Sequence, residues 1–140
     1  LQQGKMMVTG AGTSTAGMAV GGNIDGSGTA TANVETYDGT NWTEGTNLNT
    51  ARAGTMVMGA TNTSVVAAGG APNKAHTEQW DGSSWTEVAD ISTARYDGTG
   101  VGTGALGFVA GGGADPGGAA GSVTTEEWTK AVAASSFTSS

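Results

Sequence analysis

The sequence contains no cysteine, only 2 prolines and only 5 basic residues among its 140 positions. Without cysteine, neither a disulfide framework nor thiolate chemistry is available, and the redox compartment stays open. The basic residues stand against 12 acidic ones, which gives a net charge of −7, so the chain lacks the basic surface that binds phosphate backbones. No apolar run approaches the roughly 20 residues that span a bilayer. We therefore expect no nucleic acid partner and no membrane span.

The sequence is instead rich in glycine, with 26 residues of 140, against an average near 7%. This glycine has no strict third-residue period, so it indicates many tight turns rather than collagen. A hydrophobic content of 36% allows one thin core. No window shows the 3.6-residue apolar stripe of a helix, and the chain is therefore predicted to be all-β. It begins LQQGKMMV, without an initiator methionine or a signal-peptide pattern, so we expect a processed product or a piece of a longer polypeptide.

One sequence motif recurs along the chain: VETYDGTNWTE at residues 34–44 is repeated as HTEQWDGSSWTE at residues 76–87. Arg52 and Arg95 are 43 residues apart, as are Trp42 and Trp85. Glycine pairs that keep a similar register are Gly21-Gly22, Gly69-Gly70 and Gly112-Gly113. Each pair begins 17 residues after Gly4, Arg52 or Arg95, respectively. Self-similarity at 20 to 50 residues is typical of repeat architectures, and it predicts three units at 1–51, 52–94 and 95–140.

Within a unit, four strand-like runs alternate with turn residues, as in GTMVMGA, TSVVAAGG, HTEQW and SSWTEV. Asp38-Gly39 and Asp81-Gly82 separate the third run from the fourth, which favours a type I′ hairpin with positive φ at both central residues. The segment from the glycine pair to the next aromatic residue varies in length between units, as surface loops do. Each unit is therefore predicted to be a four-stranded antiparallel sheet, with a degenerate end after Trp128.

These sheets, each with a double glycine and aromatic residues at fixed places, resemble kelch repeats, the blades of a β-propeller. The links LNTAR and ISTAR belong to the same pattern. The segments AGTSTAGMAVGG and EQWDGSSWTEVADISTAR are also similar in style to the Gly/Thr-rich kelch-like arrays of predicted phage tail and virion proteins, especially marine ones. The resemblance implies a rigid scaffold whose loops bind protein partners or, in enzymes with added cofactors, substrates.

Several residues recur in register and are expected to be structural. The aromatic set could stack on sugars, but one large flat residue at the same place in each blade favours packing between blades. Its members are Tyr37, Trp42, Trp80, Trp85 and Trp128. Glu35, Glu78 and Glu126 could do acid/base work, yet their register favours ion pairs or hydrogen bonds with Arg52, Arg95 or a backbone group of a neighbouring blade. His76 is the only histidine and is expected to be an ordinary strand-edge residue.

The candidate binding residues lie in the loops whose length varies. They are Asn23, Asp25, Ser27, Asn73, Lys74 and Asp115. The oxygen donors of residues 23–29 could hold Ca²⁺, but this segment lacks the long loop and terminal bidentate glutamate of an EF-hand, so we expect a solvated loop. No nucleophile, base and orienting group recur together, and we expect no catalytic residue, metal or cofactor.

Three blades cannot close a ring, because propellers typically have about 4 to 8. Open end blades would expose apolar faces. We expect the chain to be part of a longer propeller, to complete a ring with other copies of itself, or to dock on another protein, such as a virion component. The leading hypothesis is a non-enzymatic structural and binding module of a virion tail, fibre or other extracellular surface, which presents loops to proteins or host glycans. The alternative is a secreted carbohydrate-binding or carbohydrate-active propeller of the sialidase or galactose-oxidase kind.

Overall fold

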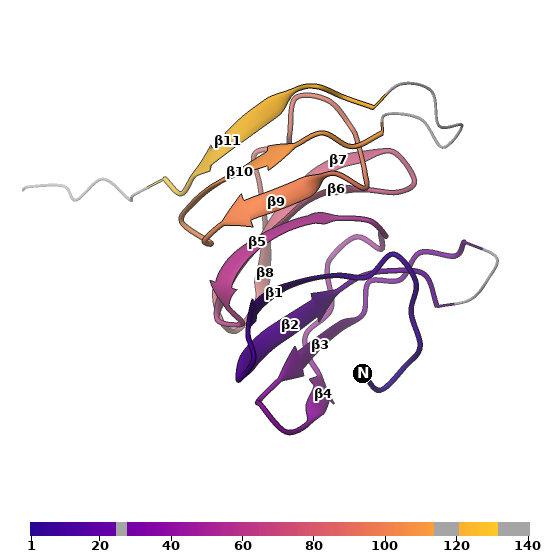
Figure 1. Ribbon diagram of the computed structural model, residues 1–140, viewed down its shortest axis with the longest axis vertical. Helices are drawn as coiled ribbons and strands as arrows, with labels where there is room; N and C mark the ends of the chain where they lie inside the picture. Colours follow the sequence, from indigo (N-terminus) through magenta and orange to yellow (C-terminus); the bar gives the residue numbers. More distant parts are fainter. Residues whose placement is uncertain (25–27, 114–120, 132–140) are drawn as a thin grey trace, which may run out of the picture.

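The computed structural model describes residues 1–24, 28–113 and 121–131, and within these ranges it contains strands and no helix. Three antiparallel sheets follow one another along the chain and stack in the same order (Figure 1). The first sheet contains β1 (Thr9–Thr13), β2 (Ala16–Val20), β3 (Val34–Tyr37) and β4 (Trp42–Glu44). The second contains β5 (Met56–Thr61), β6 (Ser64–Gly70), β7 (Lys74–Trp80) and β8 (Trp85–Val88). The third contains β9 (Thr99–Gly102), β10 (Leu106–Ala110) and β11 (Thr125–Thr129).

The predicted all-β class is confirmed, and the sheets have the form of propeller-like blades. Within the first and second sheets, the strand order follows the chain, β1-β2-β3-β4 and β5-β6-β7-β8. Each sheet lies inside one of the predicted units 1–51, 52–94 and 95–140. The third sheet has three strands among the described residues, and the degenerate end predicted after Trp128 lies mostly outside those ranges. No described helix is long and apolar enough to cross a membrane.

The core consists of two apolar layers between neighbouring sheets, because the second sheet is covered on both faces. Successive residues of a strand point to opposite faces. Val57, Val65 and Ala67 therefore pack in the layer shared with the first sheet, whereas Met56, Met58, Val66 and Ala68 pack in the layer shared with the third. This double burial explains why SVVAAG reads as a continuous apolar run rather than an alternating one.

The glycine pairs hold positive φ angles, but the structure corrects their register in the third unit. Gly21-Gly22 and Gly69-Gly70 match Gly111-Gly112, whose φ angles are 69° and 91°, rather than Gly112-Gly113. The residue that corresponds to the arginines is likewise Lys5 rather than Gly4, as the ion pairs described below show. The second unit has one extra residue before its glycine pair because β5 contains a bulge between Met58 and Thr61.

The Asp-Gly turns differ from the type I′ prediction. The strands are joined by four residues, 38–41 and 81–84, and only the glycine of each Asp-Gly has positive φ. The Asp38 Oδ1 atom accepts the N–H groups of Thr40 and Asn41 at 2.8 and 2.7 Å, and Asp81 holds Ser83 and Ser84 in the same way. This side-chain turn satisfies the loop amides without a left-handed aspartate, so the two-residue hairpin does not form.

Candidate functional site

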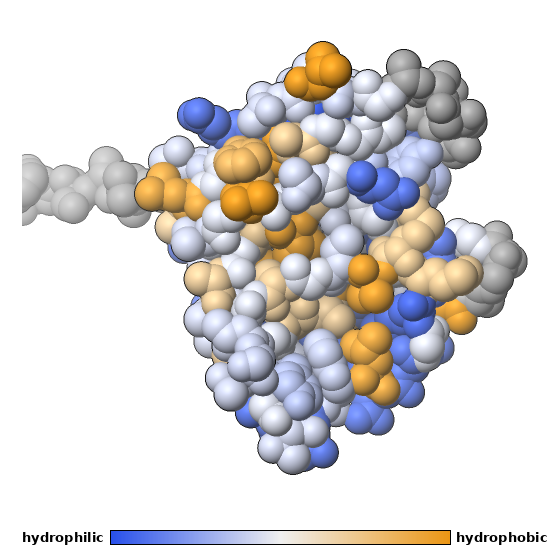
Figure 2. All heavy atoms as spheres, viewed as in Figure 1, coloured by the Kyte–Doolittle hydropathy of each residue, from blue (hydrophilic) through white to orange (hydrophobic). Residues whose placement is uncertain are grey.

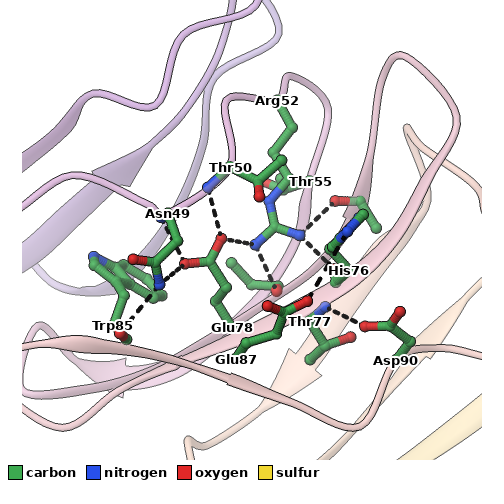
Figure 3. A network of polar contacts seen from close by, with 12 residues as sticks. Asn49, Thr50, Arg52, Thr55, His76, Thr77, Glu78, Trp85, Glu87 and Asp90 are labelled. Carbon is green, nitrogen blue, oxygen red and sulfur yellow. Dashed lines mark hydrogen bonds and ion pairs between the residues drawn. The ribbon is translucent and has the colours of Figure 1, made fainter.

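A buried ion pair joins the second sheet to the link that precedes it (Figure 3). The Nη2 atom of Arg52 lies 2.9 Å from Oε1 of Glu78, and the two side chains are 0% and 2% exposed. Glu78 also accepts the backbone N–H of Asn49 at 2.8 Å and that of Thr50 at 3.3 Å. Arg52 further donates to backbone carbonyls, including that of His76. The guanidinium and carboxylate thus join the link before β5 to strand β7.

The same arrangement occurs once in each sheet, and we call these ion pairs the sheet clasps. In the first sheet, Lys5 Nζ lies 2.8 Å from Glu35, which also accepts the N–H of Gln2. In the third sheet, Arg95 lies 2.8 Å from Glu126, which also accepts the N–H of Ser92 at 2.7 Å. Each clasp lies within one sequence unit, so the cation holds the glutamate of its own sheet.

Lys5 was not identified from the sequence. The other two units have an arginine at the equivalent position, and the spacing to the glycine pair was counted from Gly4. A cation 16 residues before a double glycine would have identified it, since Lys5 precedes Gly21 and Arg95 precedes Gly111 by that spacing.

The electrostatics of the clasps reflect their burial. Desolvation raises the pKa of Glu35, but the hydrogen bonds from Lys5 and Gln2 together with the charge of Lys5 outweigh it, so the net pKa is below the ordinary value. Desolvation lowers the pKa of Arg52, and the nearby carboxylates, Glu78 foremost, only partly oppose this shift. Each buried charge therefore depends on its partner, as expected for structural ion pairs.

The backbones of Arg52 and Arg95 also hold the preceding sheet. The N–H of Gly22 donates to the carbonyl of Arg52 at 3.0 Å, and the N–H of Gly70 donates to that of Arg95 at 2.8 Å. The arginine N–H groups return the contact to carbonyls of Thr31 and Lys74. One residue therefore ties two sheets together, through its side chain in its own sheet and through its backbone to the sheet before.

The recurring aromatic residues lie in or beside the packing layers. Trp80 and Trp85 are each 7% exposed, and their indole N–H groups donate to the carbonyls of Asn62 and Thr46 at 2.9 and 3.0 Å. Thr46 belongs to the link that follows the first sheet, so Trp85 bridges two sheets. Tyr37 and Trp42 form a tilted pair at 5.1 Å between ring centroids and are half-buried.

Trp128 is also half-buried and packs against the layer between the second and third sheets. Its indole N–H donates to the carbonyl of Gly104 at 3.2 Å. Trp80 and Trp85 are the two most buried of the five rings.

The predicted loop residues are placed differently from one another. Asn23 is only 8% exposed, because its backbone pairs with Met6, so it is not a free loop residue. Asn73 is exposed in the short turn between β6 and β7, with φ of 45°, and Lys74 begins β7 half-buried. The remaining candidates, Asp25, Ser27 and Asp115, lie outside the described residues.

A cavity of about 360 Å³ lies beside these loops and draws its lining from all three units. Its walls include Met7 and Asn23 from the first unit, Ala71 and Pro72 from the second, and Tyr96 from the third. Of these residues, sequence reasoning proposed only Asn23. No sequence signal marked Met7, Pro72 and Tyr96, because they do not recur in register as identical residue types. Only the stacking of the sheets brings them together.

Few titratable side chains of the described residues lie close to one another outside the sheet clasps. His76 Nε2 lies 3.9 Å from the Glu87 carboxylate. Backbone N–H groups, those of Ser84 and Ser83 foremost, lower the pKa of Asp81 to about 2, which suits a turn acceptor rather than a proton donor. Among the residues that the structure describes, no group of three or more His, Cys, Asp and Glu side chains is placed to hold a metal ion.

The fold and the repeated clasps define this chain as an all-β protein of propeller-like blades. Among solved structures, the chain is similar to one described as "Structure of YjhT", a β-propeller-like fold, with a TM-score of 0.78 and 16% sequence identity. The match covers 91% of this chain but only 44% of that chain, so this chain spans less than half of its length. At this identity, the likeness concerns the fold alone. No family model matches the chain, and the curated proteins include no significant match.

Proposed function

We propose that this chain is a non-enzymatic structural and binding module, which contributes kelch-like blades to a larger propeller-like assembly and presents the loops of one face to a partner. The observation that carries this proposal is the sheet clasp. The glutamate that recurs in each unit is held by a cation and a backbone N–H. The most regular polar groups of the repeat are thus engaged in holding each sheet together.

Two further observations support binding rather than turnover. The half-buried and exposed residues around the 360 Å³ cavity, such as Tyr96 and Pro72, come from three units and form a composite surface beside the loops. The surface carries an excess of acidic residues, with a net charge of −7, which suits an exported, soluble part of an assembly. The resemblance of the sequence to phage tail arrays favours a virion tail or fibre as that assembly, with a protein or a host glycan as the partner.

A glycan panel tests this proposal. The purified chain is expected to leave every glycan intact over long incubation, and binding to an immobilised glycan or protein is expected to weaken at least tenfold on Tyr96→Ala. Thr40→Ala, in the exposed turn that follows β3, is the matched control with unchanged binding. Hydrolysis that is lost on Glu35→Gln while the variant stays folded would contradict the proposal and favour the carbohydrate-active alternative.

The assembly is tested separately with particles from the source organism. An antibody against the chain is expected to label tails or fibres in electron micrographs. Label found only in the soluble secreted fraction would contradict the virion location.

A further inference from the structure

The third sheet has an apolar face that no described residue covers. Val101 of β9 and Phe108 of β10 are cross-strand partners on this face, and they are 48% and 37% exposed. Their neighbours Gly100 and Gly107 point the other way, toward Val57 and Met58 of the second sheet. Figure 2 shows apolar atoms at the surface in the region that β9 and β10 occupy in Figure 1. We call this surface the trailing face.

The first sheet has glycines at the positions where the third sheet packs closely against the second sheet. At Gly100, an added Cβ would lie 2.5 Å from the Val57 carbonyl oxygen, so the preceding sheet approaches this backbone closely. Gly10 and Gly17 occupy the places of Gly100 and Gly107, since each lies 90 residues earlier, as Lys5 lies before Arg95. The atoms nearest to Gly10 and Gly17 belong to the first sheet itself. We call this surface the leading face.

Two series of hydrogen bonds between sheets stop at these faces. One series joins a glycine N–H to the clasp carbonyl of the next sheet, at Gly22 to Arg52 and at Gly70 to Arg95. In the described part of the chain, the next donor in this series, the N–H of Gly112, has no partner, and neither has the carbonyl of Lys5.

The second series joins residues with left-handed backbones at the start of each sheet. The N–H of Gly54 donates to the carbonyl of Met7 at 2.8 Å, and the N–H of Asp97 donates to that of Gly54 at 2.9 Å. Over the described residues, the N–H of Met7 and the carbonyl of Asp97 are the unpaired ends. The trailing face therefore offers one donor and one acceptor, and the leading face offers the complementary acceptor and donor.

We propose that the trailing face binds the leading face of a second copy of this chain, and that two copies close a ring of six sheets. This inference rests on the proposed function and names its first partner. In each contact, the N–H of Gly112 donates to the carbonyl of Lys5 in the second copy, and the N–H of Met7 in the second copy donates to the carbonyl of Asp97.

The three sheets of the described residues favour two copies. Two such sets of sheets reach a number within the usual range of about 4 to 8 blades, which three sets would exceed. A head-to-tail contact that closes also leaves no open edge for further growth.

Gly111 provides a specific test, because its surroundings change only if the contact forms. A Cβ on Gly21 or Gly69, its equivalents, would lie 2.3 or 2.4 Å from the clasp carbonyl oxygen of the next sheet. On Gly111, the nearest atom is the Ser122 carbonyl oxygen at 3.7 Å. Gly111→Ala therefore fits the single chain apart from the strain of a positive φ, but its methyl group would collide with Lys5 of the second copy.

The matched control is Gly28→Ala, which has the same kind of backbone strain, with φ of 84° and no atom within 4 Å. In multi-angle light scattering, the parent and Gly28→Ala are expected to have twice the chain mass of 13.6 kDa. Gly111→Ala is expected to be a folded monomer, with a dissociation constant raised at least a hundredfold. Val101→Lys, at an exposed position of the trailing face, is expected to do the same without a folding cost.

Hydrogen exchange gives a second readout that needs no variant. The amides of Met7 and Gly112 are expected to exchange more slowly as the parent concentration rises through the dissociation constant. A monomeric parent at 100 µM, a mass above that of the dimer, or a Gly111→Ala variant that still dimerises would overturn the inference, as would fast exchange of both amides in the dimer. Glycan turnover tests the proposed function independently: an inert monomer overturns only the dimer, whereas a dimer that hydrolyses glycans overturns only the proposed function.

Discussion

Replacement of Arg52 by methionine tests the sheet clasps most directly. Methionine keeps an unbranched apolar side chain in the layer but removes the guanidinium, so the Glu78 carboxylate stays buried at 2% exposure without its cation. Breaking a buried pair in this way costs about 3 to 5 kcal/mol. The N–H groups of Asn49 and Thr50 still reach the carboxylate and keep the loss within that range.

Arg95→Met is the matched comparison, because the same clasp in the third sheet has a carboxylate with 25% exposure. Water can hydrate Glu126 once its cation is gone, so this loss is expected to be only about 1 to 2 kcal/mol. The double variant Arg52→Met with Glu78→Gln is expected to recover part of the Arg52→Met loss, since it leaves no unpaired charge.

Urea unfolding followed by tryptophan fluorescence measures these free energies, and thermal melting gives a second scale. For a domain of this size, the Arg52→Met loss corresponds to a melting temperature about 10 to 15 °C lower. Equal losses for Arg52→Met and Arg95→Met, or an Arg52→Met loss below about 1 kcal/mol, would refute the view that burial makes the clasp essential.

Three further outcomes are expected. Trp85→Ala should cost about 3 to 5 kcal/mol in urea unfolding, and Trp42→Ala clearly less, because only Trp85 is buried under a neighbouring sheet; equal losses would contradict this. Gly69→Ala should destabilise more than Gly28→Ala by the same assay, since its Cβ would lie 2.4 Å from the Arg95 carbonyl oxygen; similar losses would speak against the close approach. The Asp81 carboxyl should titrate near pH 2 by NMR. The contribution of the ionised carboxylate to protein stability is therefore complete above the ordinary pKa of 3.8 and is lost as pH falls through about 2. A midpoint near 3.8 would exclude the turn hydrogen bonds.

The strand pattern and the repeat were predictable because their causes are local. Alternation of apolar residues and the punctuation by glycine are written within a few residues of each strand, so β5 to β8 follow the runs read from the sequence. The Asp-Gly turns show the limit of this local reading. The same dipeptide favours a type I′ turn, but the carboxylate of Asp81 captures two loop amides and selects a longer loop.

The site was less predictable, because its contacts join residues far apart in sequence. Glu35 was recognised from its register, but its partner Lys5 is a different cation 30 residues away, and only the folded sheet shows that they meet. Asn23 was expected in a solvated loop, yet its pairing with Met6 buries it.

The sequence by itself determined the all-β class, because short-range patterning selects strands over helices. The recurrence of Arg52, Trp42 and their equivalents predicts three units. Tertiary structure alone decided which faces the described residues cover. Packing depends on what lies across each sheet, and so Val66 is buried at 0% exposure while its equivalent Phe108, on the last sheet, is 37% exposed. The physical reason is that identical local patterns acquire different surroundings at the ends of a stack.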